Sequence, residues 1–422
     1  MTSKTAATAK RPFSKVCVLG LGYVGLPTAA VFASRGLDVL GVDVNPETVS
    51  RINKGEIHIV EPELDIMVSA AVSAGKLSAA TEPEAADAFI IAVPTPFTDG
   101  HKPDLSFVEA ATHALAPHLK AGDLVVVEST SPVGTTEKVS TWLSERRSDL
   151  VFPHMDPDGA DVSVSHSPER VLPGRVLLEL VGNDRVVGGL SPACAQRTAQ
   201  LYGLAISGEC HLTTAHTAEL VKLAENAYRD VNIAFANELA RVSETLGVDV
   251  WDAIRLANRH PRVDILKPGP GVGGHCIAVD PWFIVDSVPD KTPLIQAARQ
   301  VNDARPFEVA EAALAAQKSS PGPIACLGLS YKADIDDLRE SPAVDVCAHL
   351  AKAGRDLMVV EPHTEALPEE ITQAGPASLV SLEEALETAS IIVLLVDHGI
   401  FRALDRRLLE GKTVLDTRGI WR

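Results

Sequence analysis

Gly20-Leu-Gly-Tyr-Val-Gly25 is the stretch of sequence that decides the fold of the first half of the chain. An apolar run at 15–19 precedes it, and a helix-forming run that closes at Gly36 follows it. In a strand–turn–helix unit of this kind, the first glycine permits the tight turn, the second lets a pyrophosphate approach the backbone, and the third lets the helix pack closely on the strand. The helix N-terminus then offers free N–H groups to the phosphates. The stretch predicts a dinucleotide site formed by Gly20, Gly22, Tyr23, Val24 and Gly25.

An acidic residue, Asp43, ends the second predicted strand at 39–42. It lies 18 residues beyond Gly25, where a carboxylate accepts hydrogen bonds from the ribose hydroxyls of a dinucleotide. A carboxylate there also repels a 2′-phosphate, so we expect the cofactor to be NAD rather than NADP. The alternative is a structural glycine turn in which Asp43 caps the helix that begins at Asn45-Pro-Glu.

Strands and helices alternate along most of the chain, which predicts parallel, doubly wound α/β sheets. A second α/β lobe is expected to begin at Ile324. A segment rich in Pro and Gly, 261–293, is expected to be loop. The expected strands are 15–19, 39–42, 88–93, 124–127 and 186–187, then 324–327, 357–360, 391–396 and 413–415, and the expected helices include 104–120 and 134–146.

One long helix is predicted from about Thr213 to Leu246, because apolar residues recur there at helical spacing without Gly or Pro. Such a helix is a candidate spine between two lobes and a candidate homodimer surface. Lys222, Asn226 and Arg229 lie at positions i, i+4 and i+7, so they point from one face. Because the surrounding segment is largely apolar, we expect this face to border a cleft. The alternative is a solvated polar stripe.

A glycine-rich loop, Gly269-Pro-Gly-Val-Gly-Gly-His-Cys-Ile-Ala-Val-Asp280, carries the candidate nucleophile Cys276. The six cysteines are scattered, without the close spacing of a zinc site or a redox pair, so most are expected to be small buried hydrophobes and no metal site is expected. A lone cysteine is usually inert. The glycines, the neighbouring His275 and the acid Asp280 at fixed spacing favour a catalytic role for Cys276.

A second unusual loop is Ser167-Pro-Glu-Arg-Val-Leu-Pro-Gly174. The adjacent Glu169 and Arg170 form either a simple surface turn or a pair of charges presented to a polar substrate.

Composition limits the class of protein. A length of 422 residues fits two or three domains, and 46% hydrophobic with 22% charged residues is globular. The net charge of -18 argues against a nucleic-acid partner, and the apolar runs are too short to cross a membrane. The polar N-terminus lacks the pattern of a secretory signal, so a loose tail on a cytoplasmic protein is expected.

Together these motifs resemble the UDP-glucose/GDP-mannose dehydrogenase family over nearly the whole chain, from Val18 to Trp421. Within that family the sequence looks most like the UDP-N-acetyl-D-mannosamine 6-dehydrogenase branch, on the segments 55–62, 259–263 and 271–284. The family markers are Gly-Leu-Gly-Tyr-Val-Gly-Leu-Pro (20–27), Val-Pro-Thr-Pro (93–96), Glu-Ser-Thr-Ser-Pro-Val-Gly (128–134), Lys222 with Asn226, the Gly-Gly-His-Cys loop, and Tyr-Lys-Ala-Asp-Ile-Asp-Asp-Leu-Arg-Glu-Ser-Pro (331–342).

One loop departs from the UDP-glucose branch, which usually has Pro-Glu-Phe-Leu-(Arg/Ala)-Glu-Gly with two acids. Pro173 replaces the second acid here, so Glu169 is the only acid in the loop. This departure speaks against UDP-glucose as the substrate.

The resemblance implies an α/β fold of two Rossmann-like, doubly wound lobes joined by a long central helix and a helical middle region. The expected parts are a disordered tail (1–12), an NAD-binding Rossmann domain (13–210), a central helical domain for dimerisation and catalysis (211–305) and a UDP-sugar-binding Rossmann-like domain (306–422).

The resemblance also implies site residues. The cofactor would contact Thr95, Thr130, Thr136 and Arg339 in addition to the glycine turn and Asp43. The sugar nucleotide would contact Arg170, Val171, Lys222, Asn226, Arg229, His260, Arg262, Gly273, Lys332 and Ala333, with His260 and Arg262 reaching it from a neighbouring subunit. The catalytic residues would be Cys276, Lys222, Asn226, Asp280, Glu169 and Thr130.

The implied reaction is the four-electron oxidation of the C6 alcohol of UDP-N-acetyl-D-mannosamine to a carboxylate, for cell-surface polysaccharide synthesis. Cys276 would form a thiohemiacetal and then a thioester. Lys222 and Asn226 would stabilise the alkoxide, Asp280 would position or deprotonate a water, and Glu169 would act as base in thioester hydrolysis. The same chemistry on UDP-N-acetylglucosamine, UDP-N-acetylgalactosamine or UDP-glucose is the alternative. A two-electron hydroxy-acid dehydrogenase and a non-enzymatic nucleotide-binding protein are the rival classes.

Overall fold

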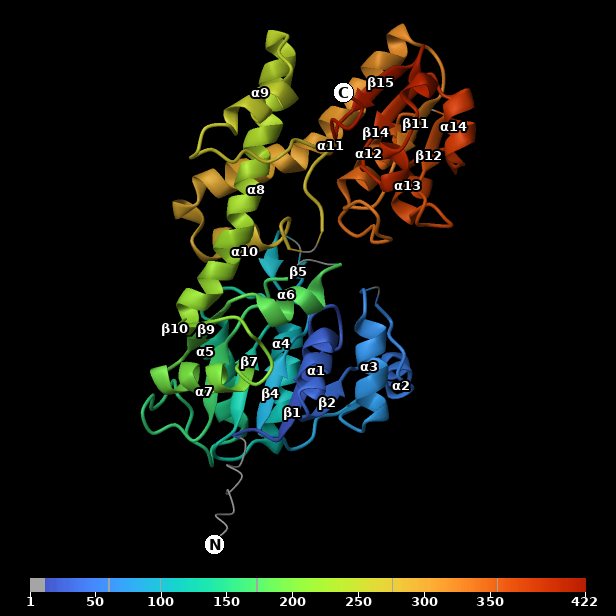
Figure 1. Cartoon of the computed structure of the whole chain (residues 1–422). Helices are drawn as coiled ribbons and strands as arrows, with labels where there is room; N and C mark the ends of the chain where they lie inside the picture. The colour runs from blue at the N-terminus through green and yellow to red at the C-terminus, as the bar shows by residue number, and fades with distance from the viewer. Residues whose placement is uncertain (1–11, 60, 99, 172–173, 275, 355) are drawn as a thin grey trace, which may run out of the picture. The chain divides into compact units, whose positions relative to one another are not determined.

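The computed structural model describes residues 12–422 except 60, 99, 172–173, 275 and 355. The predicted tail, apart from Pro12, lies outside the described residues. The chain forms two compact units, Met1–Ala224 and Glu225–Arg422 (Figure 1). Each unit is built around one largely or wholly parallel β-sheet with helices on both faces, so the predicted fold class is confirmed.

The first unit contains an eight-stranded sheet in the order β10-β9-β8-β7-β4-β1-β2-β3. All neighbouring strands are parallel except β8 and β9, which are antiparallel. The strand order reverses between β1 and β4, which is where a doubly wound sheet opens a crevice for a nucleotide. The strands are β1 Lys15–Leu19, β2 Asp38–Val42, β3 Leu77–Ala80, β4 Ala88–Ile91, β7 Leu124–Val127, β8 Ser163–His166, β9 Arg185–Gly189 and β10 Cys210–Thr214.

Helices bury both faces of this sheet. On β1, Val16 and Val18 pack into one core cluster, and Cys17 and Leu19 pack into the other. Alternate residues of one strand therefore lie in different cores, which explains why the strand is apolar throughout. The helices are α1 Gly25–Ser34, α2 Pro46–Asn53, α3 Leu64–Ser73, α4 Ser106–Leu115 with the 3-10 turn η1 Ala116–His118, α5 Thr135–Arg146, α6 Val176–Gly182 and α7 Pro192–Tyr202, and β5 Phe97–Thr98 pairs with β6 Lys102–Pro103.

The predicted long helix is confirmed as α8, Ala215–Leu246, which begins in the first unit and ends in the second. Its buried apolar positions include Ala218, Leu223, Ala227 and Ala234. A second set of apolar side chains on α8 is exposed, and we call this set the apolar seam. The apolar seam consists of Leu220, Tyr228, Phe235, Val242 and Leu246.

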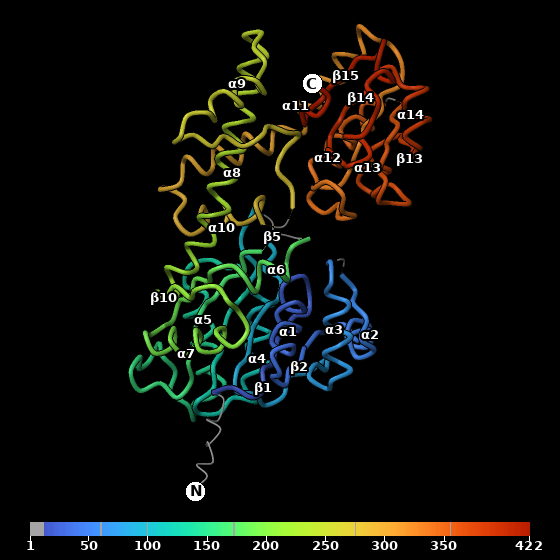
Figure 2. Tube along the Cα trace, viewed as in Figure 1, coloured from blue at the N-terminus to red at the C-terminus, as the bar shows by residue number. Residues whose placement is uncertain are grey.

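The segment 261–293 is not all loop, so this prediction was partly wrong. It contains α10, Asp280–Ser287, and the 3-10 turn η2, Pro289–Lys291. Pro281 occupies the first turn of α10, where its missing N–H costs no helical hydrogen bond. The described residues between α9 (Val250–Ala257) and α10 form neither helix nor strand, as the tube in Figure 2 shows. The long helix α11, Pro293–Ser319, follows.

The second unit ends in a five-stranded, fully parallel sheet in the order β13-β12-β11-β14-β15. Its order again reverses beside the first strand, β11, so this sheet has its own switch point. None of the described helices is long and apolar enough to cross a membrane. The elements are β11 Ile324–Leu327, α12 Pro342–Lys352, β12 Leu357–Val360, α13 Glu369–Ala374, β13 Ala377–Leu379, α14 Leu382–Thr388, β14 Ile391–Leu394, α15 Gly399–Arg402, η3 Arg406–Leu409 and β15 Thr413–Asp416.

Candidate active site

The glycine turn between β1 and α1 needs glycine at two of its three motif positions. Gly20 has φ +90°, and a Cβ there would lie 2.5 Å from the Ala92 carbonyl oxygen. A Cβ on Gly25 would lie 1.8 Å from the Gly20 carbonyl oxygen. Gly22 is exposed and a Cβ there would meet nothing within 4 Å, so the backbone at Gly22 is open to a ligand. This geometry fits the pyrophosphate of a dinucleotide at the start of α1.

Asp43 lies directly after β2, beside this turn. Its Oδ2 accepts the Leu21 N–H at 3.0 Å, and its Oδ1 accepts the Asn45 N–H at 2.9 Å. The cap of α2 is Asn45, whose side chain accepts from Glu47 N, so the alternative in which Asp43 caps this helix is wrong. Asp43 is half-buried at the carboxyl end of β2, the place from which an acid reaches a ribose.

The three threonines predicted to contact the cofactor lie in different surroundings. Thr95 donates its hydroxyl to the Thr130 carbonyl at 2.5 Å, and both residues are half-buried. Thr136 is fully buried, and its hydroxyl donates to Glu219 Oε1 at 2.6 Å. The Thr136 hydroxyl therefore fastens the start of α5 to α8, and its contact with the cofactor stays a prediction.

Glu169 lies in a buried charge cluster rather than in a free surface turn. Its Oε2 accepts from Arg185 Nη2 at 2.6 Å, and its Oε1 accepts from Arg170 N at 2.6 Å. Arg185 Nη1 also donates to Glu128 Oε1 at 2.9 Å. Burial opposes the charge on Arg185, but Glu169, Tyr202 and Glu128 more than offset this and raise its pKa. The cluster holds the carboxylate of Glu169 in one position.

The far end of the same loop is fastened by Glu61. Its two oxygens accept the backbone N–H groups of Gly174 at 2.9 Å and Val176 at 2.7 Å. Arg170 and Val171 are half-buried between these fixed ends. Pro173 lies outside the described residues.

Lys222 lies in the first unit, close enough to His166 for its charge to act on that ring. Burial, aided by the charge of Lys222, lowers the pKa of His166 to about 3, and the nearby Val127 backbone only partly opposes this. Neither ring nitrogen of the buried His166 has a well-formed hydrogen bond among the described residues. His166 is thus a neutral imidazole at the end of β8, directly before the Glu169 loop.

Asn226 and Asp280 form a buried hydrogen bond in the second unit. Asn226 Nδ2 donates to Asp280 Oδ2 at 2.5 Å. Both side chains are buried, so a purely solvated polar stripe does not describe Asn226. The amide nitrogen carries a second hydrogen, which is available for an oxygen that gains charge. Arg229, one turn further on, is exposed.

Cys276 is exposed, whereas the other five cysteines are buried or half-buried. Its carbonyl accepts the Asp280 N–H at 2.8 Å, so Cys276 lies one turn before α10. The positive end of a helix stabilises a thiolate. His275 lies outside the described residues.

The glycine-rich loop packs against the segment 331–342, within the second unit. Gly274 N donates to the Glu340 carbonyl at 3.3 Å, and a Cβ on Gly273 would lie 2.4 Å from the same oxygen. Glycine is therefore needed for this close approach. Lys332 and Arg339 are exposed on that segment, and Ala333 is half-buried.

The remaining predicted site residues, His260 and Arg262, are exposed in the segment between α9 and α10. Four side chains that the sequence motifs did not single out hold the predicted site residues in place: Glu61, Glu128, Arg185 and Glu219. Glu61 lies in the segment 55–62 and Glu128 begins the family marker 128–134, so both could have been found from the sequence. No motif or residue spacing around Arg185 or Glu219 indicates their roles.

Models of one protein family match successive parts of the chain. The UDP-glucose/GDP-mannose dehydrogenase family matches with its NAD binding domain at 14–206, its central domain at 216–304 and its UDP binding domain at 325–422.

Two curated relatives cover nearly the whole chain. An NDP-N-acetyl-D-galactosaminuronic acid dehydrogenase from Ralstonia nicotianae is 57% identical over 97% of this chain and 96% of its own. A UDP-N-acetyl-D-mannosamine dehydrogenase from Escherichia coli (strain K12) is 52% identical over 97% of this chain and 100% of its own. Among solved structures, the UDP-D-ManNAc dehydrogenase from Pyrococcus horikoshii has a TM-score of 0.87 at 39% identity and covers 96% of each chain.

Proposed function

Since the chain belongs to the UDP-glucose/GDP-mannose dehydrogenase family and is an NAD-dependent nucleotide-sugar dehydrogenase, we propose that it oxidises C6 of UDP-N-acetyl-D-mannosamine to the carboxylate. The product, UDP-N-acetyl-D-mannosaminuronate, would serve cell-surface polysaccharide synthesis. The three-domain division at 13–210, 211–305 and 306–422 is part of this proposal.

The observation that carries the proposal is the exposed thiol of Cys276 at the start of α10, one turn from the buried pair of Asp280 and Asn226. Converting an alcohol to an acid removes four electrons, and NAD supplies the hydride acceptor twice. The Cys276 thiolate adds to the carbon of the intermediate aldehyde and gives a thiohemiacetal. Loss of the second hydride leaves a thioester, which water cleaves to the acid and the free thiol.

Two groups stabilise the negative charge that develops on the C6 oxygen. Lys222 acts either as a fixed positive charge or as the acceptor of the proton that leaves the C6 hydroxyl, and Asn226 supplies the amide hydrogen that Asp280 does not use. Thr130, half-buried and fixed to Thr95 through its carbonyl, completes the proposed catalytic set.

Two carboxylates are candidates for handling the hydrolytic water. Asp280 is fixed by Asn226 and follows Cys276 by one turn. Each oxygen of Glu169 already accepts a hydrogen bond, so as a base Glu169 would act through a remaining lone pair or give up a bond. We therefore assign the first choice to Asp280 and retain Glu169 as the second.

The sugar nucleotide is proposed to contact the residues that the family resemblance implies. These are Arg170, Val171, Lys222, Asn226, Arg229, Gly273, Lys332 and Ala333, with His260 and Arg262 supplied by a second copy of the chain. The cofactor is proposed to contact the glycine turn, Asp43, Thr95, Thr130, Thr136 and Arg339. The apolar seam of α8 supports a homodimer, because three of its members, Tyr228, Phe235 and Val242, repeat every seven residues.

UDP-N-acetylgalactosamine is the second candidate substrate, because the Ralstonia relative at 57% identity is named for galactosaminuronic acid. A panel of UDP-sugars with NAD, followed by NADH absorbance, separates the candidates. We expect the highest kcat/KM with UDP-N-acetyl-D-mannosamine and two NADH for each sugar oxidised. A higher kcat/KM with the galactosamine substrate would overturn the substrate assignment, and one NADH per sugar would overturn the four-electron reaction.

A further inference from the structure

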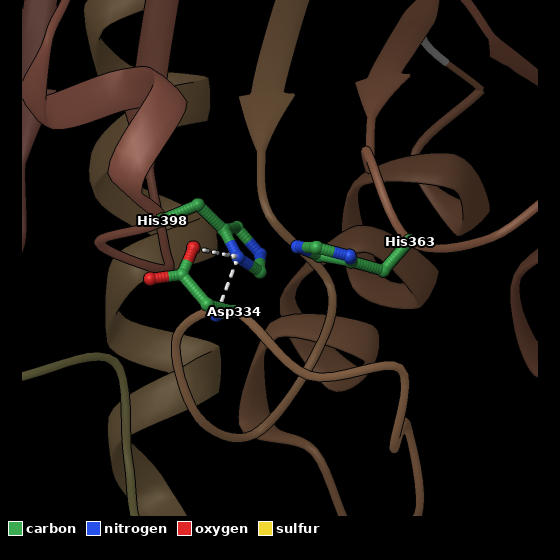
Figure 3. A group of neighbouring side chains, drawn as sticks. All are labelled: Asp334, His363 and His398. Atoms are coloured by element: carbon green, nitrogen blue, oxygen red, sulfur yellow. Dashed lines mark hydrogen bonds and ion pairs between the residues drawn. The ribbon is translucent and has the colours of Figure 1, made fainter. Parts of the chain in front are cut away.

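His398 is a fully buried histidine at the carboxyl end of the sheet in the second unit, and the proposed reaction does not use it. Its Nδ1 accepts the backbone N–H of Asp334 at 2.9 Å (Figure 3). Its Nε2 lies 3.2 Å from Glu361 Oε2 and 3.3 Å from Ser330 Oγ. An imidazole whose Nδ1 accepts a hydrogen bond carries its proton on Nε2, so Nε2 donates to Glu361.

Glu361 has the same backbone contacts in this sheet as Asp43 has in the other. Asp43 accepts from the residue after Gly20 and from the residue two positions beyond itself. Glu361 accepts from Leu329, the residue after Gly328, at 2.6 Å, and from His363, two positions beyond itself, at 3.0 Å.

The two acids differ in what surrounds them. Asp43 is half-buried, whereas Glu361 is buried and bonded to His398. Burial would raise the pKa of Glu361, but hydrogen bonds from His398 and from backbone N–H groups more than offset this and lower it. Glu361 is therefore an ionised acceptor that orients His398 and is closed to a ribose.

The bonds of His398 and Ser330 lie on either side of Lys332 and Ala333. Ser330 Oγ donates to the Lys332 carbonyl at 2.7 Å, and Asp334 N donates to His398. Asp334 has φ +60°, a conformation that costs energy for a residue other than glycine. Gly399 N donates to the Asp334 carboxylate at 2.8 Å and helps to hold it there. The backbone at Lys332 is thus fixed from both sides.

Asp334, His363 and His398 have the side-chain types of a cation site, and their candidate ligand atoms lie within 4.8 Å of one another. The His398 lone pair nearest Asp334 already accepts a backbone N–H, and the opposite nitrogen faces Glu361. A cation would have to break one of these bonds. The group is better explained as a hydrogen-bonded brace than as a metal site.

We propose that His398 is a positioning residue for nucleotide binding, which sets the backbone of Lys332 and Ala333 through the acceptor Nδ1. This inference rests on the proposed function, in which Lys332 contacts the UDP moiety. In this proposal His398, which is fully buried, acts through the backbone of residues 332–334 and touches neither substrate nor cofactor.

Two variants separate the bonds of His398. In His398→Asn, the amide oxygen replaces Nδ1 as the acceptor for Asp334 N–H, and the bond to Glu361 is lost. In His398→Gln, the amide N–H replaces Nε2 as the donor to Glu361, and the acceptor for Asp334 is lost. Both variants keep a neutral amide in a buried position, so differences in folding are small compared with those from an apolar replacement.

The experiment measures UDP affinity by calorimetry, and KM and kcat with the UDP-sugar, on the full-length enzyme. We expect His398→Asn to bind UDP within about threefold of the wild type, and His398→Gln to bind about tenfold more weakly, because the part-buried Asp334 N–H loses its acceptor. KM should rise for the Gln variant while kcat stays within about twofold. Equal affinities for the two variants, or losses of kcat that match those of kcat/KM, would overturn the inference.

A control keeps the inference distinct from the proposed function. Lys332→Met should itself weaken UDP binding if Lys332 contacts the nucleotide. Wild-type affinity in Lys332→Met contradicts the proposed role of Lys332. Weakened binding in Lys332→Met together with wild-type binding in His398→Gln contradicts the role of His398 alone. Thermal unfolding of each variant identifies any variant that fails to fold. Ser330→Ala, which removes the hydrogen bond from Ser330 Oγ to the Lys332 carbonyl, is then measured in place of that variant.

Discussion

Arg185 Nη2 lies 2.6 Å from Oε2 of Glu169, and both side chains are buried. Arg185 is the first residue of β9, so its ion pair joins the Pro168–Gly174 loop to the sheet. Through Glu128, which accepts from Thr28 on α1 at 3.1 Å, the same cluster contacts the helix of the glycine turn. One guanidinium therefore stabilises both the Pro168–Gly174 loop and helix α1.

Replacing Arg185 with Met should destabilise the protein by about 3–5 kcal/mol, because two buried carboxylates lose their counter-ion. Denaturant unfolding followed by tryptophan fluorescence measures the change. The triple variant Arg185→Met, Glu128→Gln, Glu169→Gln removes the unpaired charges as well and should recover part of the loss. A triple variant as unstable as the single one would show that charge imbalance is not the cause.

Cys276→Ser should cripple the second oxidation far more than the first, because a serine hydroxyl is a weaker nucleophile than a thiolate. Intact-protein mass spectrometry after mixing with substrate and NAD should detect a covalent adduct on the wild type and none on Cys276→Ala. The half-buried Cys210 is the matched control, and Cys210→Ser should turn over normally. Two NADH per sugar from Cys276→Ala would end the covalent mechanism.

Asp43→Ala should weaken NAD binding and relax discrimination against NADP, since the ribose loses an acceptor and the 2′-phosphate loses a repulsive charge. Steady-state kinetics with both cofactors measures the ratio of kcat/KM values. Asp38→Ala, at the exposed start of the same strand, should leave that ratio unchanged. A wild type that prefers NADP would contradict the proposed role of Asp43.

The apolar seam should hold two copies of the chain together. Phe235→Asp places a charge in the middle of the seam and should shift the protein toward monomer in light scattering, with loss of activity if His260 or Arg262 completes the partner's site. Ile66→Asp, at an even more exposed apolar position on α3, should leave the oligomeric state unchanged. A fully active wild-type monomer would reject the homodimer.

Acid should destabilise the wild type through His166. Burial, with a contribution from Lys222, lowers the pKa of this ring from 6.5 to about 3, so between these pH values the unfolded chain binds a proton that the folded chain does not. The stability contributed at neutral pH is then lost as the pH falls below about 6.5, by roughly 1.4 kcal/mol per pH unit. Unfolding measurements from pH 7.5 to 4.5 compare the wild type with His166→Leu. As the pH falls below about 6.5, the free energy of unfolding of the wild type should decrease more steeply than that of the variant, by about this slope. Parallel pH profiles would show that His166 is not the group responsible.

The features that sequence analysis predicted well are local. The turn Gly20–Gly25 follows from backbone sterics, since a side chain at 20 or 25 would overlap nearby backbone. The helix α8 follows from apolar spacing over 32 residues. The error at 261–293 has a local cause too: Pro281 suggested a loop, whereas proline is accepted in the first turn of a helix.

The sequence by itself determined the two α/β lobes, the glycine turn with Asp43, the long helix and the candidate nucleophile Cys276, because each is encoded by neighbouring residues or by a short periodic pattern. Only the tertiary structure decided which side chains hold these groups in place. Asn226 meets Asp280 across 54 residues, Arg185 meets Glu128 across 57, and Glu61 meets Gly174 across 113. Such contacts depend on which strands and loops become neighbours when the sheets assemble, and no local pattern in the chain specifies them.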